Sequence, residues 1–251
     1  MSVKHFIIIS SSYVDGNRIA MDFTSTDKLN IMEITRVMNR IKKECGYDVP
    51  LSTQCLSTAS ADWSSVVAFD SFFDGIVLYT DPAKFISVIQ KSRILNGVDV
   101  AKYILSLVEC THTKLQKLTY FCYAEYLCRT NRRLFEDTIY AFTYGPVVDS
   151  IYKICKNNQG DQITQLDTNN SIHSTTPGSA AKSKILFSSD GPGKLAVIDD
   201  TIQKYGNFSA SVLVDITHRQ DSPWHCVYNP NIFHQLISDS DIVKHHFKEQ
   251  I

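Results

Sequence analysis

Residues 111–129, THTKLQKLTYFCYAEYLCR, combine helical periodicity with apolar side chains on nearly every side. When successive residues are placed about 100° apart, Leu115, Leu118, Cys122 and Tyr126 form one stripe, and most of the remaining circumference is also apolar. A helix with this distribution usually lies at the centre of a core. Four charged residues also fall within the segment, and a charge at the middle of a bilayer costs several kcal/mol. The segment therefore predicts the central helix of a soluble domain rather than a membrane span.

Length and charge favour an ordinary cytoplasmic protein. A chain of 251 residues can bury about 70% of the surface that its unfolded form exposes. With 25 basic and 26 acidic residues, its net charge of -1 gives no general attraction to nucleic acids or membranes. The N-terminal residues do not form a signal peptide, and the seven cysteines are odd in number, which indicates reduced thiols without disulfides.

The first 94 residues predict a small α/β domain. Two strand-like runs within residues 4–24 are separated by a turn at Gly16, which predicts a hairpin. A helix is expected over residues 29–44. Two further strands are expected within the runs 49–56 and 73–80, and a helix over 82–93 with Asp81 as its N-cap.

Residues 97–251 predict a mainly helical domain, so the chain as a whole belongs to the α+β class. Helices are expected over residues 98–109, 111–129, 146–157, 195–205 and 209–216, with a last helix capped by Ser238 or Ser240. Residues 158–182 are dominated by Asn, Gln, Thr, Ser, Asp and Gly, and this composition predicts a mobile loop.

The common catalytic motifs are missing from the sequence. It has no Gly-rich phosphate loop, no HExxH, no GxSxG and no paired CxxC. His218, His225, Cys226 and His234 include zinc-ligand types, but their spacing matches no closed site. The alternative is one or two hydrogen-bonded histidines beside a buried Trp224. We expect no catalytic residue, metal or cofactor.

A cysteine nucleophile is a weaker hypothesis. Cys122 or Cys128 could act with His218 brought near by folding. Both lie on the apolar helix, however, and a thiol buried in apolar surroundings has a raised pKa and is inert. Packing explains these cysteines better.

The first expected helix carries a basic side. Arg36, Arg40 and Lys43 fall at i, i+4 and i+7, opposite the apolar positions. A contact with nucleic acid or an acidic partner is conceivable, but solvated basic faces are common and the domain is neutral. We therefore do not expect nucleic-acid binding.

Three polar residues, Lys114, Gln116 and Lys117, interrupt the apolar helix. Burial of such groups requires hydrogen bonds or carboxylate partners. Either their polar ends reach the surface along apolar stems, or they form an internal network. Candidate members of such a network are Glu125, Tyr144 and His218.

Three segments together resemble the Panacea family, also called the SocA-like antitoxin domain, which is known from bacteria and phages. They are HTKLQKLTYFCYAEYL (112–127), LFEDTIYAFTYGPVV (134–148) and YGNFSASVLVDITHRQDSPW (205–224). The resemblance covers about residues 97–251, so residues 1–94 are an added domain. Arg219 and Gln220 depart from the family pattern, because an acidic residue commonly follows its histidine.

The resemblance implies a helical domain built around residues 112–128. Tyr144, Gly145 and Pro146 would shape a turn, and a second set of residues would close over it. This second set is Thr217, His218, Pro223 and Trp224. Members of the family neutralise a toxin encoded beside them, by direct binding or by delivery to a protease.

These expectations combine into one functional hypothesis. The protein is a non-enzymatic antitoxin of a toxin-antitoxin system that binds its cognate toxin, with contacts at Tyr120, Tyr123, Tyr144 or the basic side of residues 36–43. Residues 1–94 could set partner choice or form a homodimer. The alternatives are an adaptor that delivers a partner to a AAA+ protease, and a metal protein or enzyme centred on His218.

Overall fold

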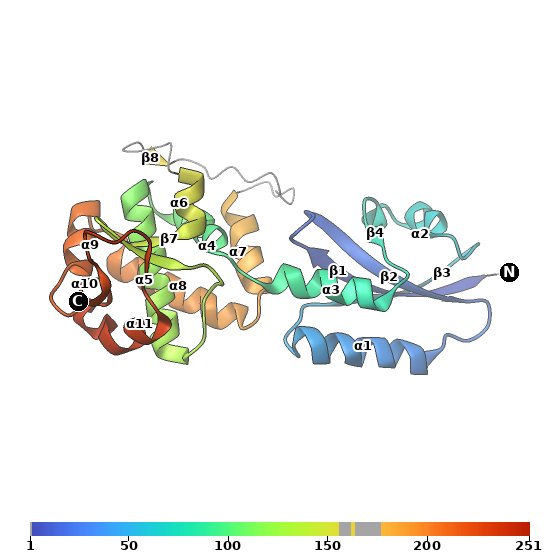
Figure 1. Ribbon diagram of the computed structural model, residues 1–251. Coiled ribbons are helices and arrows are strands. Elements are labelled where there is room, and N and C mark those ends of the chain that lie inside the picture. Colours follow the sequence, from blue (N-terminus) through green and yellow to red (C-terminus); the bar gives the residue numbers. More distant parts are fainter. Residues whose placement is uncertain (1, 156–161, 164–176) are drawn as a thin grey trace. The chain divides into compact units, whose positions relative to one another are not determined.

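The computed structural model describes residues 2–155, 162–163 and 177–251, which form two compact units (Figure 1). Unit 1 contains the described residues up to Ile94 together with Phe187–Ser189. Unit 2 contains the other described residues, from Leu95 onward. A sheet-containing N-terminal region thus precedes a mainly helical one, and the predicted α+β class is confirmed.

Unit 1 is built on a four-stranded sheet with the order β3-β1-β2-β4. The predicted hairpin is present, since β1 (Val3–Ser12) pairs antiparallel with β2 (Asn17–Ser25). β1 also pairs antiparallel with β3 (Ser52–Thr58), whereas β4 (Val77–Leu78) is parallel to β2. β1 therefore lies inside the sheet and β3 at its edge.

Helices cover both faces of this sheet (Figure 1). Ile8 packs on one face against α1 (Ile31–Cys45) and α3 (Pro82–Arg93). The neighbouring Ile7 packs on the opposite face, against α2 (Trp63–Phe69) and the 3-10 turn η1 (Ser71–Phe73). Because alternate residues of a strand point to opposite faces, the run Phe6 to Ile9 can supply two cores. The sequence analysis did not predict α2 or η1.

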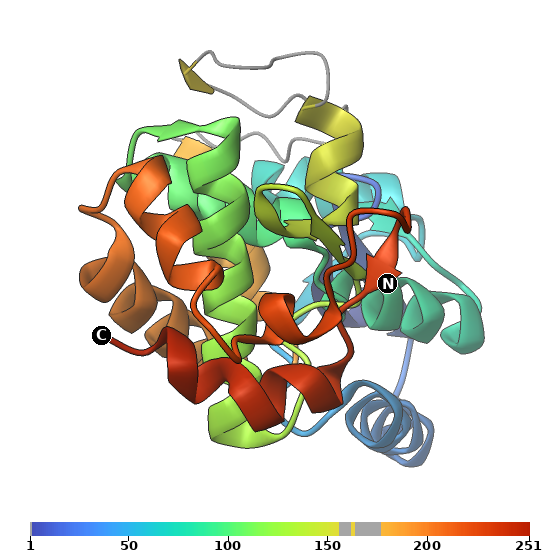
Figure 2. The ribbon, with the colours of Figure 1, turned by 60° about the vertical axis from the view of Figure 1, so that its left-hand side comes forward.

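Unit 2 surrounds one helix, α5 (His112–Thr130), which passes through the middle of the domain (Figure 2). Its neighbours include α4 (Gly97–Leu107), α6 (Asp149–Cys155), α8 (Gly191–Tyr205), α9 (Ala210–Thr217), α11 (Asp239–His245) and β7 (Gly145–Val148). The remaining elements are β5 (Cys110–Thr111), β6 (Ile139–Phe142), β8 (Gln162–Ile163), α7 (Pro177–Phe187), α10 (Pro223–Val227), β9 (Gln235–Leu236) and the 3-10 turn η2 (His246–Glu249). Residues 115–127 of α5 are all buried, as the apolar circumference predicts.

Two predictions in unit 2 are wrong in part. The helix expected over 146–157 begins only at Asp149, because Gly145–Val148 instead forms β7 and pairs with β6. The loop expected over 158–182 lies largely outside the described residues, but its end is helical. There α7 begins at Pro177, and proline suits the first position of a helix because it needs no hydrogen-bonded N–H.

Candidate functional site

The turn between β6 and β7 is the feature on which all three sequence motifs converge. Gly145, the first residue of β7, has a φ of 96°, a conformation that side-chain-bearing residues rarely adopt. A Cβ at this position would lie 2.6 Å from Thr217 Oγ1 and 2.9 Å from Lys117 Cε. Only glycine lets the hairpin backbone approach these two side chains so closely.

On one side, α5 holds β7 through two buried polar residues. The Val148 N–H donates to Gln116 Oε1 at 2.8 Å, and Gln116 Nε2 donates to the Val148 carbonyl at 3.3 Å. Lys117 Nζ donates to the Pro146 carbonyl at 2.8 Å. An internal network therefore exists, but apart from a 3.3 Å contact of Gln116 Nε2 with His112 Nε2 these bonds go to backbone groups, not to the candidate side chains Glu125, Tyr144 and His218. Lys114, one turn earlier in the helix, is half-buried.

On the other side, α9 and α10 hold the turn through two aromatic rings. Trp224 Nε1 donates to the Phe142 carbonyl at 2.7 Å. His218 Nε2 lies 3.2 Å from the Thr143 carbonyl, and the His218 and Trp224 ring centroids are 3.7 Å apart. The three motifs therefore act together to fix the backbone of one hairpin.

The pKa of Lys117 lies far from the ordinary value of a lysine. Burial lowers its pKa to about 7, although the negative charge of Glu249 opposes this shift. The cause is the loss of hydration, which penalises the charged form of a buried amine. Lys117 thus loses its proton near neutral pH and still keeps its hydrogen bond to Pro146.

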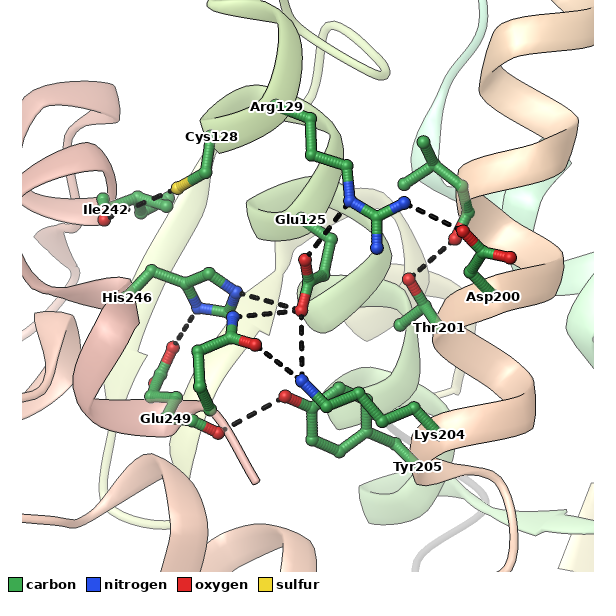
Figure 3. Close-up of polar contacts among 12 residues, drawn as sticks. Glu125, Cys128, Arg129, Asp200, Thr201, Lys204, Tyr205, Ile242, His246 and Glu249 are labelled. Carbon is green, nitrogen blue, oxygen red and sulfur yellow. Dashed lines mark hydrogen bonds and ion pairs between the residues drawn. The ribbon is translucent and has the colours of Figure 1, made fainter.

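A second buried polar cluster joins α5 to the C-terminal turn η2 (Figure 3). Glu249 Oε2 accepts a hydrogen bond from Tyr120 Oη at 2.9 Å and lies 2.7 Å from His246 Nδ1. On its other side, His246 Nε2 lies 3.6 Å from Glu125 Oε1. His246 is thus placed between two carboxylates, all three side chains being buried.

The pKa values of this cluster follow from burial and from the charges within it. Burial alone would raise the pKa of Glu125, but the nearby His246, the hydrogen bond from Gln250 and the charge of Lys204 lower it to about 2. For Glu249 burial prevails and the pKa is raised. Burial opposes the charged form of His246, yet the two carboxylates prevail and raise its pKa. The cluster favours an imidazolium that attaches η2 to α5.

The tyrosines of α5 bury their rings and pair their hydroxyl groups with carboxylates. Besides Tyr120, Tyr123 Oη donates to Asp239 at 2.6 Å and Tyr126 Oη donates to Asp190 at 2.8 Å. Tyr120 and Tyr123, which we had considered as partner contacts, are therefore buried within the domain. The sequence analysis missed their acidic partners. The one available signal was that a buried hydroxyl requires a partner.

Tyr144 has the opposite environment. It stands in the hairpin turn with 71% of its surface exposed and borders a pocket of about 360 Å³. The pocket lies between the start of α5 and one side of α9. Its other lining residues are Thr111, His112, Thr113, Ala210, Ser211, Val214 and Asp215.

Comparison with protein families now identifies this part of the chain. Residues 115–225 match the family described as Antitoxin SocA-like, Panacea domain. This part of the chain is therefore similar to a Panacea domain. The matched segment includes most of α5, the β6–β7 hairpin, His218 and Trp224, which confirms the predicted resemblance. No match was found among curated proteins or solved structures.

Two of the candidate zinc ligands, His218 and Cys226, contact other side chains of unit 2. His218 contacts Trp224, whereas Cys226 Sγ lies 3.6 Å from His245 Nδ1. Within the described ranges, no three His, Cys, Asp or Glu side chains are grouped so that they could hold a metal. Burial raises the pKa of Cys122, and it raises that of Cys128 to about 11. Neither thiol is activated as a nucleophile by its surroundings.

The basic side predicted for the first helix lies outside the matched residues, on α1 of unit 1. Arg36, Arg40 and Lys43 are all exposed, and Arg40 Nε pairs with Glu44 Oε1 at 2.6 Å. Part of this charge is therefore balanced locally. In the part of the chain that the structure describes, no helix is long and apolar enough to cross a membrane.

Proposed function

We propose that the protein is a non-enzymatic antitoxin that neutralises a cognate protein toxin by direct binding, with both proteins in the cytoplasm. The observation that carries this proposal is the Panacea match over residues 115–225. Its motif side chains bond to the backbone of the β6–β7 hairpin. Such an arrangement is suited to presenting a rigid surface.

The toxin contact is proposed at Tyr144 and the pocket beside it. An exposed tyrosine on a rigid turn is suited to binding, because its large ring buries much area at little cost in conformational entropy. Tyr144 is the only exposed residue among the three tyrosines that the sequence suggested. The adjacent pocket could accept a side chain of the toxin.

The test is co-expression of the full chain with the product of the adjacent gene, read as growth rescue and as recovery of a complex. Tyr144→Ala should lose both, whereas Tyr47→Ala, which removes a tyrosine that is 87% exposed in unit 1, should retain both. If only Tyr47→Ala loses growth rescue and complex formation, the toxin contact lies in unit 1. Wild-type protein that neither rescues growth nor forms a complex would refute the antitoxin proposal.

The same cells distinguish inhibition from delivery to a protease. A directly inhibited toxin stays abundant but inactive, whereas an adaptor for a AAA+ protease shortens the half-life of its partner. We expect an unchanged half-life in a pulse-chase measurement. We further propose that residues 1–94 set partner choice, so exchanging this region for that of another Panacea protein should change which toxin is neutralised.

A further inference from the structure

Strand β3 leaves one edge of the unit 1 sheet open. It pairs with β1 and has no second strand beside it among the described residues. Ser52–Cys55 are four successive exposed residues, so side chains on both faces of this strand meet solvent. An open edge presents backbone N–H and C=O groups that can pair with another strand.

This edge has none of the usual protection against strand pairing. Within Ser52–Thr58, with the sequence STQCLST, there is no charged residue and no proline. Its register with β1 runs without interruption from Ile9↔Ser52 to Val3↔Thr58, so no bulge turns it away. The opposite edge differs, because β4 has only two residues.

The strand is also complementary to itself. Cys55 is the midpoint of Ser52–Thr58, so antiparallel pairing of two copies about this residue places Cys55 opposite Cys55. Ser52 then faces Thr58, and Thr53 faces Ser57. The hydroxyl of Thr58 is already bonded within unit 1, but Thr53 and Ser57 are exposed, and a hydroxyl-bearing pair of this kind stabilises antiparallel strands. No like charges are opposed.

We propose that two copies of the protein pair through their β3 edges, antiparallel and centred on Cys55, so that two four-stranded sheets become one. A second copy fits better than a foreign peptide because the same seven residues supply both sides of a symmetric contact. The two-fold axis is perpendicular to the sheet, so α1 and α3 of both copies lie on one face and α2 on the other. The contact lies in unit 1 and does not depend on the toxin-binding proposal.

The first experiment uses sedimentation of the reduced full-length protein over a range of concentrations. We expect a monomer–dimer equilibrium, because one strand pair buries less than the roughly 1,200–2,000 Å² of a standard stable interface. A monomer at every concentration would overturn the proposal.

Oxidative cross-linking then locates the contact. Residues directly opposite in antiparallel strands have Cα atoms about 4.5–5.5 Å apart, which a disulfide can bridge. With diamide as oxidant, two Cys55 thiols form the S–S bond, and diamide accepts their two electrons and two protons. The cross-linked dimer should be lost in Cys55→Ser and retained in Cys226→Ser, which removes another exposed cysteine. The reverse pattern would place the contact elsewhere.

Paired charge variants test the register. Thr53→Lys with Ser57→Lys sets two lysines opposite each other at both symmetric positions and should abolish the dimer. Thr53→Lys with Ser57→Glu sets lysine opposite glutamate and should retain it. Both positions are exposed, so circular dichroism should show equal folding of the two variants. A dimer that persists in the double-lysine variant, or that is lost equally in both, would refute this register.

Discussion

Replacing Lys117 by Met tests whether the buried amine makes stability depend on pH. The pKa of Lys117 is about 7 in the folded protein, against an ordinary value of 10.5. Below pH 7 the amine is charged in both the folded and unfolded states. Between pH 7 and 10.5 the unfolded chain binds the extra proton, so the titration of Lys117 by itself raises the free energy of unfolding with pH in this window.

The size of this change in unfolding free energy follows from the shift in the pKa of Lys117. Linkage allows at most about 1.4 kcal/mol per pH unit for one proton. Because the slope is only half of this at the folded pKa, the gain between pH 7 and 9 is about 2 kcal/mol. Lys117→Met has no such titration, so the unfolding free energy of wild type minus that of the variant should increase by this amount.

Urea unfolding of both proteins at pH 7, 8 and 9, at constant ionic strength, measures this difference. Subtraction cancels the titrations that the two proteins share. The charge of Lys117 also acts on two neighbours: burial raises the pKa of Glu249, which Lys117 opposes, whereas burial and Lys117 together lower the pKa of His112. A difference that stays constant from pH 7 to 9 would refute the assignment of a neutral buried amine.

Three further substitutions test how unit 2 is held together, each by urea unfolding. Gln116→Leu should lower the free energy of unfolding by about 2–4 kcal/mol, because it removes the side chain that bonds to the buried N–H and C=O of Val148. The control Gln203→Leu, at an exposed site of α8, should change it little. Gly145→Ala should cost about 1–3 kcal/mol or more, since φ is 96° and the new Cβ has no room. Ser238→Ala should lower the free energy of unfolding by about 1 kcal/mol, because α11 loses its N-cap. For each of the three variants, a urea midpoint equal to that of wild type would contradict the role assigned to the residue.

Elements with local signals were predicted well from the sequence. Asp81 followed by Pro82 marks the start of α3, where the Asp81 side chain accepts from the Ala83 N–H at 2.8 Å. Gly16 similarly separates the two strands of the hairpin. These signals succeed because a cap or a turn is decided by neighbouring residues.

Elements defined by distant contacts were not predictable in the same way. The segment Gly145–Val148 is a strand because it pairs with β6 and because Gln116, 32 positions before Val148, bonds to its backbone. The partner of Tyr120 is Glu249, 129 positions later. The need for a partner follows from burial of a hydroxyl, but its identity depends on how the whole domain folds.

The apolar circumference of α5 limits where recognition can take place. Its rings are buried on every side, and the polar atoms of Gln116, Lys117 and Tyr120 are used within the domain. Substitutions on this helix should therefore impair binding through loss of stability. A substitution of Tyr144 should impair binding while the fold is kept. Stability and toxin affinity should therefore be measured on both kinds of variant. Together they separate the residues that support the fold of unit 2 from the residue proposed to make the contact.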